Sequence, residues 1–299
     1  MGFLRASEIR ATNGPTIITL QPLEFRPWSC NLIDHAVRAL RCEIMPEVDL
    51  EPNYLESERA WFADYYREEH VNPIGMGLRV RRDLANALKH SGRRTLGRVL
   101  SIGCGDGRFE RLLAPSAESV VGIDISPDAI SIANAIAARD GLTNLKFQVK
   151  TTDEFDWNGP FDTVFCMALF HHLPEGEVPG LASRIYQNLE RGGLLFTLDP
   201  NADAVMRKIG RIILGGRYHN YHTDDERELS PSDTRAIICR SGFDRVDYLP
   251  ADWTLIPAMY ILSQGPQWPL RRCDWVDRLC FRLPIDRWAS RFSLAAHKD

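Results

Sequence analysis

The sequence predicts an α/β fold in which helices cover both faces of a doubly wound, mostly parallel sheet. Short apolar runs typical of strands alternate with segments of helical spacing from residue 98 to residue 249. Strands separated by helices indicate parallel pairing with cover on both faces. A length of 299 residues and an apolar share of 44% suit either two globular domains or one large domain with extensions.

The composition excludes several classes of protein. There are 36 Lys and Arg against 40 Asp and Glu, and the pI is about 6.1. The net charge of the chain therefore gives no overall attraction to nucleic acid. No apolar run approaches the roughly 18 residues that span a bilayer. The 7 cysteines are scattered without a C-x-x-C pair, which favours reduced thiols over zinc or disulfides. Because the first residues also lack a signal-peptide pattern, we expect a cytoplasmic protein.

The N-terminal region differs from the rest of the chain. Residues 1–60 hold several prolines and no sustained period, which predicts an irregular extension in which Thr16–Leu20 is a candidate strand. Apolar residues at helical spacing then predict one helix over residues 56–70 and a second over residues 77–90.

Strand and helix signals then alternate. A helix begins at Ser126 and Pro127, an N-cap followed by a first-turn proline, and stops at Gly141. A second helix precedes Gly192 and Gly193, and a third runs from Ser230 to Gly242. We expect strands over residues 98–102, 119–124, 145–149, 161–167, 194–198, 245–249 and 292–296.

A glycine-rich turn follows the first of these strands. Gly103, Gly105 and Gly107 have the spacing G-x-G-x-G, and glycine lets a backbone approach a ligand closely. Residue 108 is arginine and no G-K-[ST] follows, so neither the dinucleotide fingerprint nor a Walker phosphate loop is present. Asp124 ends the next strand, where a carboxylate can accept hydrogen bonds from ribose hydroxyls. Taken singly, these features are also compatible with a structural turn and a capping acid.

Two further segments complete a recognisable pattern. They are FDTVFCMALFHHL over residues 161–173 and LERGGLLFT over residues 189–197. With the glycine turn and Asp124, this pattern resembles the class I S-adenosylmethionine-dependent methyltransferases over residues 95–250. The resemblance implies a Rossmann-like sheet of seven strands in the order 3-2-1-4-5-7-6. It also implies S-adenosyl-L-methionine as the cofactor and S-adenosyl-L-homocysteine as the product.

The resemblance carries roles over to residues near the first two strands. Gly103, Cys104 and Gly105 match the loop that wraps the methionine part of the cofactor. Asp124 matches the acid that holds the ribose, and Ile125 the residue that flanks the adenine.

The resemblance also assigns residues after the third and fourth strands. Thr152 or Asp153 is expected to face the exocyclic amine of the adenine, and Met167 and Ala168 to pack on the cofactor. One departure concerns Ser101, because the family often has an acid at that position. A carboxylate that helps to position the cofactor is therefore missing from this strand.

Histidines provide candidates for a general base. His171 and His172 follow the fourth strand, and an imidazole can deprotonate a hydroxyl or amine. The alternative is that one packs against the sheet and the other bonds to backbone. His219 and His222, with nearby carboxylates, have no third ligand at defined spacing. We therefore predict no metal there, and a substrate-facing loop or a solvated turn instead.

The segment from Trp253 to Trp288 is predicted to be a helical insertion before the last strand. Trp275, Val276 and Leu279 fall on one helical face, and arginines fall mostly elsewhere. We favour a lid whose aromatic face packs on the core. The alternative is weak contact with an anionic membrane surface.

These observations predict three parts. Residues 1–90 form an extension with helices that cover the active site, residues 91–250 form the cofactor-binding core, and residues 251–299 form the lid-like insertion and the final strand. An acidic chain with aromatic pocket elements favours methyl transfer to a small-molecule or lipid-like acceptor. The alternatives are a nucleic-acid methyltransferase, a nicotinamide-dependent oxidoreductase and a non-catalytic cofactor-binding partner.

Overall fold

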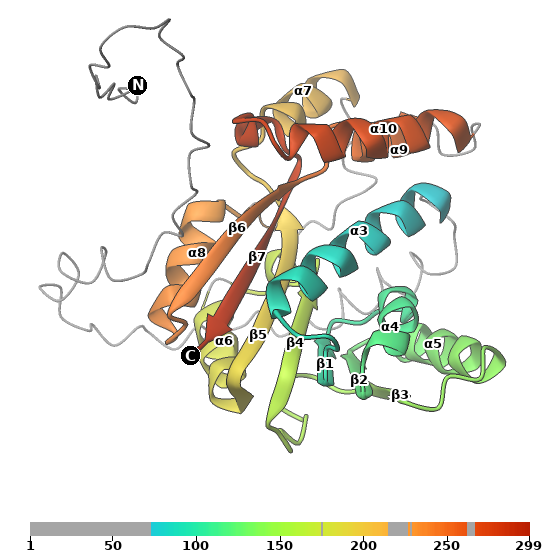
Figure 1. The fold of residues 1–299 in the computed structure, drawn as a ribbon, viewed down its shortest axis with the longest axis vertical. Coiled ribbons are helices and arrows are strands. Elements are labelled where there is room, and N and C mark those ends of the chain that lie inside the picture. The colour runs from blue at the N-terminus through green and yellow to red at the C-terminus, as the bar shows by residue number, and fades with distance from the viewer. Residues whose placement is uncertain (1–72, 175, 215–226, 228, 262–266) are drawn as a thin grey trace, which may run out of the picture.

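The computed structural model describes residues 73–174, 176–214, 227, 229–261 and 267–299. The candidate strand Thr16–Leu20, the helix predicted over residues 56–70 and the polar cluster with His219 and His222 lie outside these residues. Within the described part, one sheet has helices on both faces and a further group of helices beyond one end (Figure 1).

The strands of this sheet agree with the predicted ones. They are β1 (Arg98–Ile102), β2 (Ser119–Asp124), β3 (Leu145–Val149), β4 (Phe161–Met167), β5 (Leu189–Pro200), β6 (Arg245–Ala251) and β7 (Arg291–Lys298). Their order is β3-β2-β1-β4-β5-β7-β6, which confirms the predicted Rossmann-like arrangement. Strands β1 to β5 pair in parallel, and β7 is antiparallel to β5 and β6.

The helices connect these strands. They are α3 (Pro73–Ser91), α4 (Arg108–Leu113), α5 (Pro127–Arg139), α6 (Glu177–Asn188), α7 (Val205–Leu214), α8 (Pro231–Arg240), α9 (Leu255–Ile261) and α10 (Gln267–Cys280), with the short turns η2 (Ala114–Ser116), η3 (Phe170–His172) and η5 (Asp286–Trp288). The predicted cap of α5 is present, because the Ser126 side chain accepts a hydrogen bond from the Ala129 backbone N–H at 3.3 Å. None of the described helices combines the length and apolar character needed to cross a bilayer.

Strand β5 starts earlier than predicted. It begins at Leu189, so Gly192 and Gly193 lie inside the strand and not before it. The pairing with β4 changes register here, between Phe161–Leu189 and Thr163–Leu194. Gly192 has a φ of 71°, a conformation that glycine adopts readily at such an irregularity.

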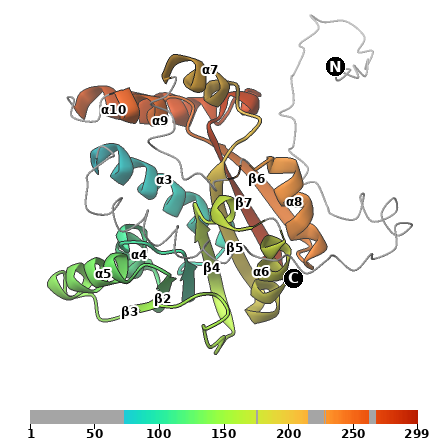
Figure 2. The ribbon, with the colours of Figure 1, turned by 180° about the vertical axis from the view of Figure 1, so that it is seen from behind.

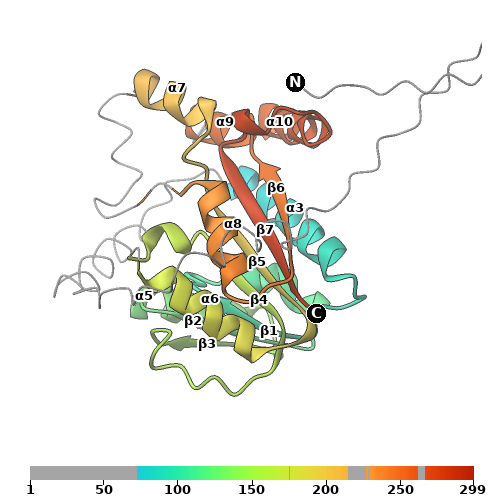
Figure 3. The same cartoon turned by 90° about the vertical axis from the view of Figure 1, so that its left-hand side faces the viewer.

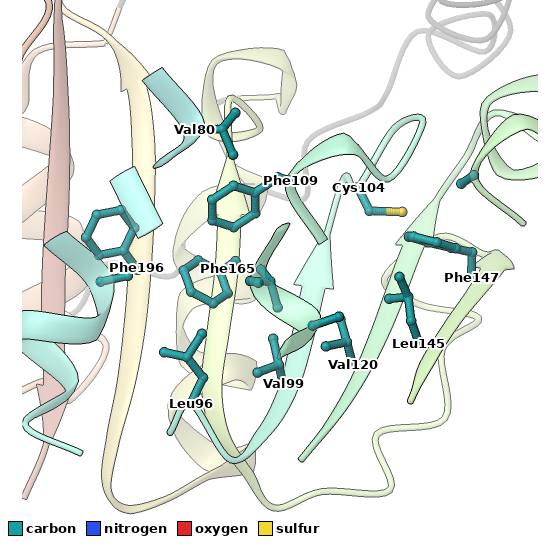
Figure 4. Packing of buried hydrophobic residues seen from close by; sticks show 14 of the residues in the cluster. Val80, Leu96, Val99, Cys104, Phe109, Val120, Leu145, Phe147, Phe165 and Phe196 are labelled. Carbon is teal, nitrogen blue, oxygen red and sulfur yellow. The ribbon is translucent and has the colours of Figure 1, made fainter. Parts of the chain in front are cut away.

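Helices α3, α4 and α5 pack on one face of the sheet (Figure 4). Phe109 of α4 meets Phe165 of β4 edge to face, with 5.0 Å between ring centroids. Val80 of α3 and Phe196 of β5 belong to the same cluster. Helices α6 and α8 lie on the opposite face (Figure 3), where Ile185 and other apolar side chains form a second buried cluster.

A third group, α7, α9 and α10, lies beyond the end of the sheet at which β5 and β6 stop (Figures 1 and 2). Arg82 of α3 reaches into this layer. It pairs with Asp252 at the end of β6, and its Nη1 lies 3.4 Å from carboxylate oxygens of both Asp274 and Asp277 on α10. This cluster of opposite charges joins the helical layer to the core.

The predicted packing of the insertion is wrong for α10. Trp275 is 62% exposed and Leu279 is 42% exposed, whereas Asp274 and Asp277 are buried. The physical reason is the arginine of α3, which draws the two acids inward and turns the aromatic face outward. Trp253, before α9, does pack inside, and its Nε1 donates to the Ile285 carbonyl at 3.1 Å.

Candidate active site

The predicted site residues follow β1, β2, β3 and β4, and the carboxyl ends of these parallel strands meet at one edge of the sheet. The loop after β1 contains three glycines in the left-handed region, with φ of 71° at Gly103, 54° at Gly105 and 69° at Gly107. Backbone N–H groups of Gly103 and Cys104 donate to the Ile123 carbonyl at 2.9 and 3.1 Å. The loop is therefore folded tightly against the end of β2.

Asp124 organises this loop. One carboxylate oxygen accepts the Gly105 N–H at 2.8 Å, and the other accepts the Ser126 N–H at 2.9 Å. Burial raises the pKa of Asp124, while these backbone hydrogen bonds act in the opposite direction. A carboxylate has about four lone-pair sites, so the group can still accept a hydrogen bond from a ribose. Ile125, the predicted adenine neighbour, is the next residue and is half-buried.

A buried acid stands beside Ser101, and the sequence analysis missed it. The Ser101 hydroxyl donates to Glu110 Oε1 at 2.6 Å, and each residue is only 1% exposed. Glu110 Oε2 is buried without a hydrogen-bond partner among the described residues. Burial raises the pKa of Glu110 from 4.5 to about 7. The signal that could have found Glu110 is its position in the helix that directly follows the glycine loop.

The end of β4 carries the next predicted residues. Met167 is half-buried and Ala168 is exposed. Ala168 has a φ of 58°, which is unusual for a residue other than glycine, and its N–H donates to the Leu198 carbonyl at 2.6 Å. Strained backbone of this kind concentrates at functional sites. The turn presents the residues after β4 at the same edge as the glycine loop.

The two histidines occupy different environments. His171 is 4% exposed, and its Nδ1 lies 2.9 Å from Oδ1 of Asp199, a buried acid near the end of β5. Burial raises the pKa of Asp199 to about 7. His172 is half-buried, and it lies close enough to Asp124 and Asp199 to lower the pKa of both carboxyl groups. The sequence analysis missed Asp199, although its position at a strand's carboxyl end was a usable signal.

Thr152 and Asp153 follow β3, as the adenine-edge assignment requires, but their groups are engaged elsewhere. The Thr152 carbonyl accepts from Trp157 Nε1 and from Arg184 Nη1, both at 3.0 Å. The Asp153 carboxylate pairs with the same guanidinium at 2.7 Å and is exposed. Their contact with an adenine stays a prediction.

One group of side chains among the described residues could hold a metal ion, and it lies away from this edge. It comprises His90, Asp247 and His297, near the opposite ends of the strands. Arg245 Nη2 lies 2.7 Å from His297 Nε2. This guanidinium competes with a metal ion for that nitrogen.

The fold and this edge define a class of protein. Residues 99–193 match the family of methyltransferase domains. Together with the strand order, this match confirms the predicted family, and the chain carries a class I S-adenosylmethionine-dependent methyltransferase domain.

Similar proteins agree with this assignment. The chain is 39% identical over 79 residues to the 2-heptyl-1-hydroxyquinolin-4(1H)-one methyltransferase of Mycobacteroides abscessus, which is 26% of this chain and 35% of the relative. It is 29% identical over 159 residues to the ubiquinone biosynthesis O-methyltransferase of Paracidovorax citrulli, which is 51% of this chain and 64% of the relative. The chain thus spans less than two thirds of either relative.

A solved structure shares the fold. Magnesium protoporphyrin IX methyltransferase from Synechocystis, with S-adenosylhomocysteine bound, has a TM-score of 0.54 and 18% identity. The match covers 82% of this chain and 100% of the other. A bound product in a structure of this fold agrees with the predicted cofactor.

Proposed function

We propose that this protein transfers a methyl group from S-adenosylmethionine to a small-molecule or lipid-like acceptor. The observation that carries the proposal is the convergence of the glycine loop, Asp124 and the turn after β4 at one edge of the sheet. The two relatives named above are named for quinolone and ubiquinone chemistry. Hydroxyl groups on an aromatic ring are therefore the first acceptors to test.

The residues at this edge fit the cofactor. The loop from Gly103 to Gly107 offers backbone without side chains at three positions, and Asp124 keeps lone pairs for the ribose. We expect Glu110 to supply from α4 the acid that is absent at Ser101, because its Oε2 is buried without a protein partner among the described residues. When bound, the cofactor supplies a methyl group that the positive sulfur already activates.

The chain's own residues would then position the acceptor and accept its proton. Orientation of two bound reactants accounts for much of the barrier reduction in such a transfer. A hydroxyl acceptor must also lose a proton, and His172 is the residue that we expect to take it. Its Nδ1 is buried, so the expected acceptor atom is Nε2. His171, held by Asp199, is better placed to fix the turn than to meet an acceptor.

The test is calorimetry with S-adenosylhomocysteine, followed by radiolabelled methyl transfer to phenolic and quinol acceptors. Binding in the micromolar range, about −7 to −8 kcal/mol, would support the proposal. No heat and no thermal shift at millimolar ligand would overturn it. Fluorescence titration with NADH separates the oxidoreductase alternative, and salt-dependent binding to DNA or RNA separates the nucleic-acid alternative.

A further inference from the structure

Helix α10 turns two acids inward beside an apolar contact of Leu270 with Leu255 and Met259, and it turns its tryptophans outward. Leu270, Asp274 and Asp277 are buried at 0%, 6% and 1% exposure. The opposite face presents Trp268 and Trp275, which are 60% and 62% exposed. A surface helix normally buries its apolar stripe, so this orientation needs a cause.

The cause is a set of polar contacts that fixes the inward face. Asp277 Oδ1 accepts the Thr254 N–H at 2.7 Å and the Thr254 hydroxyl at 2.8 Å, at the start of α9. Asp277 and Asp274 also pair with Arg82. Asp274 would keep Arg278 of the same helix as a partner at 2.9 Å, but turning the aromatic face inward would take Asp277 away from both Arg82 and Thr254. The outward aromatic face is therefore specified by the core.

Exposed apolar residues are concentrated in and directly after α10. Six of the nine large apolar residues most exposed among the described residues come from this segment and the turn after it: Trp268, Trp275, Leu279, Phe281, Leu283 and Trp288. Helix α7 lies beside η5, and its Ile212 is 82% exposed. Exposed apolar patches of this kind mark binding sites for proteins or membranes.

The charge of this face selects between those partners. Five arginines are exposed between residues 267 and 288: Arg271, Arg272, Arg278, Arg282 and Arg287. Of the three acids in the same stretch, only Asp286 is exposed, because Asp274 and Asp277 point inward. Arg272 lies over the Trp268 ring, 4.8 Å from its centroid. Tryptophan beside arginine suits the boundary between lipid headgroups and acyl chains.

We propose that the outward face of α10, with η5 and α7, binds the surface of an anionic lipid bilayer. The helix would lie in the plane of the interface, with its tryptophans in the acyl boundary and its arginines at lipid phosphates. The layer stands beyond the ends of β5 and β6 (Figure 3), on the side of the sheet to which the carboxyl ends of the parallel strands point. This placement would let a lipid-like acceptor reach the site from the membrane, an inference that rests on the proposed function.

The test is flotation of the full chain with vesicles of phosphatidylcholine and phosphatidylglycerol at 3:1. A Trp268→Ser/Trp275→Ser variant removes apolar contact, and an Arg271→Gln/Arg282→Gln variant removes charge. The matched control is Arg139→Gln/Arg240→Gln, which removes the same charge from exposed positions on or at the ends of α5 and α8. Circular dichroism and thermal melting check that all variants fold, as expected for outward side chains.

We expect the wild type and the control to float with anionic vesicles and to bind at least tenfold less to pure phosphatidylcholine. The tryptophan variant should lose at least tenfold in affinity. The arginine variant should lose about fivefold per arginine removed. A wild type that stays unbound, or a tryptophan variant that floats equally well, would overturn the proposal. So would a dimer, seen by light scattering, that the tryptophan variant abolishes while vesicles remain unbound. Flotation needs no methyl transfer, so this proposal can fail while the proposed function stands.

Discussion

Ser101 and Glu110 form a buried pair at the base of the cofactor loop, with the serine hydroxyl 2.6 Å from the glutamate Oε1. The serine occupies the strand position at which related domains often carry an acid. In this protein Glu110, on the helix that follows the loop, brings a carboxyl group to that serine.

Glu110→Gln should change the pH dependence of stability. Burial raises the pKa of Glu110 from 4.5 to about 7, so the folded chain holds this proton over a pH range in which the unfolded chain has lost it. The free energy of unfolding therefore falls as pH rises through that range. Urea unfolding measures this. Relative to wild type, the free energy of unfolding of the variant should increase by up to about 3 kcal/mol between pH 4 and pH 8. A difference that does not change with pH would refute the assignment.

The same variant tests the proposed role in cofactor binding. We expect Glu110→Gln to weaken the binding of S-adenosylhomocysteine about tenfold. The loss of one charged partner costs about 1.5 kcal/mol of binding free energy. Calorimetry at pH 8 measures this, and Glu118→Gln is a control for a glutamate outside the loop. Unchanged affinity would leave Glu110 a purely structural acid.

Asp124→Ala should weaken the cofactor about 10- to 150-fold, because a charge-assisted contact to the ribose is worth about 1.5–3 kcal/mol. The structure adds that Gly105 and Ser126 lose their acceptor at the same time. Asp124→Asn, which keeps one acceptor oxygen, should fall between wild type and alanine. Asp140→Ala, on an exposed carboxylate, should bind as wild type does.

Glycine substitutions should separate binding from folding. Gly105→Val places a branched side chain at a φ of 54° and should abolish cofactor binding. Gly107→Val brings a Cβ within 2.3 Å of the Phe147 ring and should mainly lower the melting temperature. Gly77→Ala meets nothing within 4 Å in α3 and should stabilise the chain by about 0.5–1 kcal/mol. If Gly105→Val and Gly107→Val had equal effects on cofactor affinity and on melting temperature, the two glycines would not have these separate roles.

The two histidines should respond differently to substitution. His172→Asn is expected to lower kcat by about 100-fold or more with cofactor affinity retained, as for loss of a general base. His171→Asn should lower the melting temperature, because it leaves the buried Asp199 without its imidazole partner. Single-turnover rates and thermal melts distinguish the two. A His172 variant with full activity would mean that the nucleophile arrives deprotonated or is deprotonated elsewhere.

Arg82→Met should cost about 3–5 kcal/mol of stability, because it removes the cation that pairs with the buried Asp277. Asp252 and Asp274 keep Arg291 and Arg278 as partners. In a double-mutant cycle with Asp277→Asn, the coupling energy should be about 0.5–3 kcal/mol. Urea unfolding of the four proteins measures it. Additive effects would show that Arg82 does not hold α10 through this acid.

Elements with local determinants could be predicted from the sequence. Apolar runs such as Val99–Ile102 are buried in the sheet, and Ser126 caps its helix as expected. The strand order came from the resemblance to a known family, since periodicity carries no pairing information. The orientation of α10 could not be predicted, because Arg82 and Asp277 are 195 residues apart in the sequence. The contact of Glu110 with Ser101 could not be predicted for a similar reason, because it depends on how the glycine loop turns.

The position of β7 has a consequence for biosynthesis. This strand comes last of the seven in chain order, yet it pairs with β5 on one side and β6 on the other. Until Arg291–Lys298 leave the ribosome, the outer edge of β5 stays open and β6 has no partner within the described sheet. A chain that ends before β7 but has released α10 would thus present an unpaired edge beside an exposed aromatic helix, which makes it a substrate for chaperones.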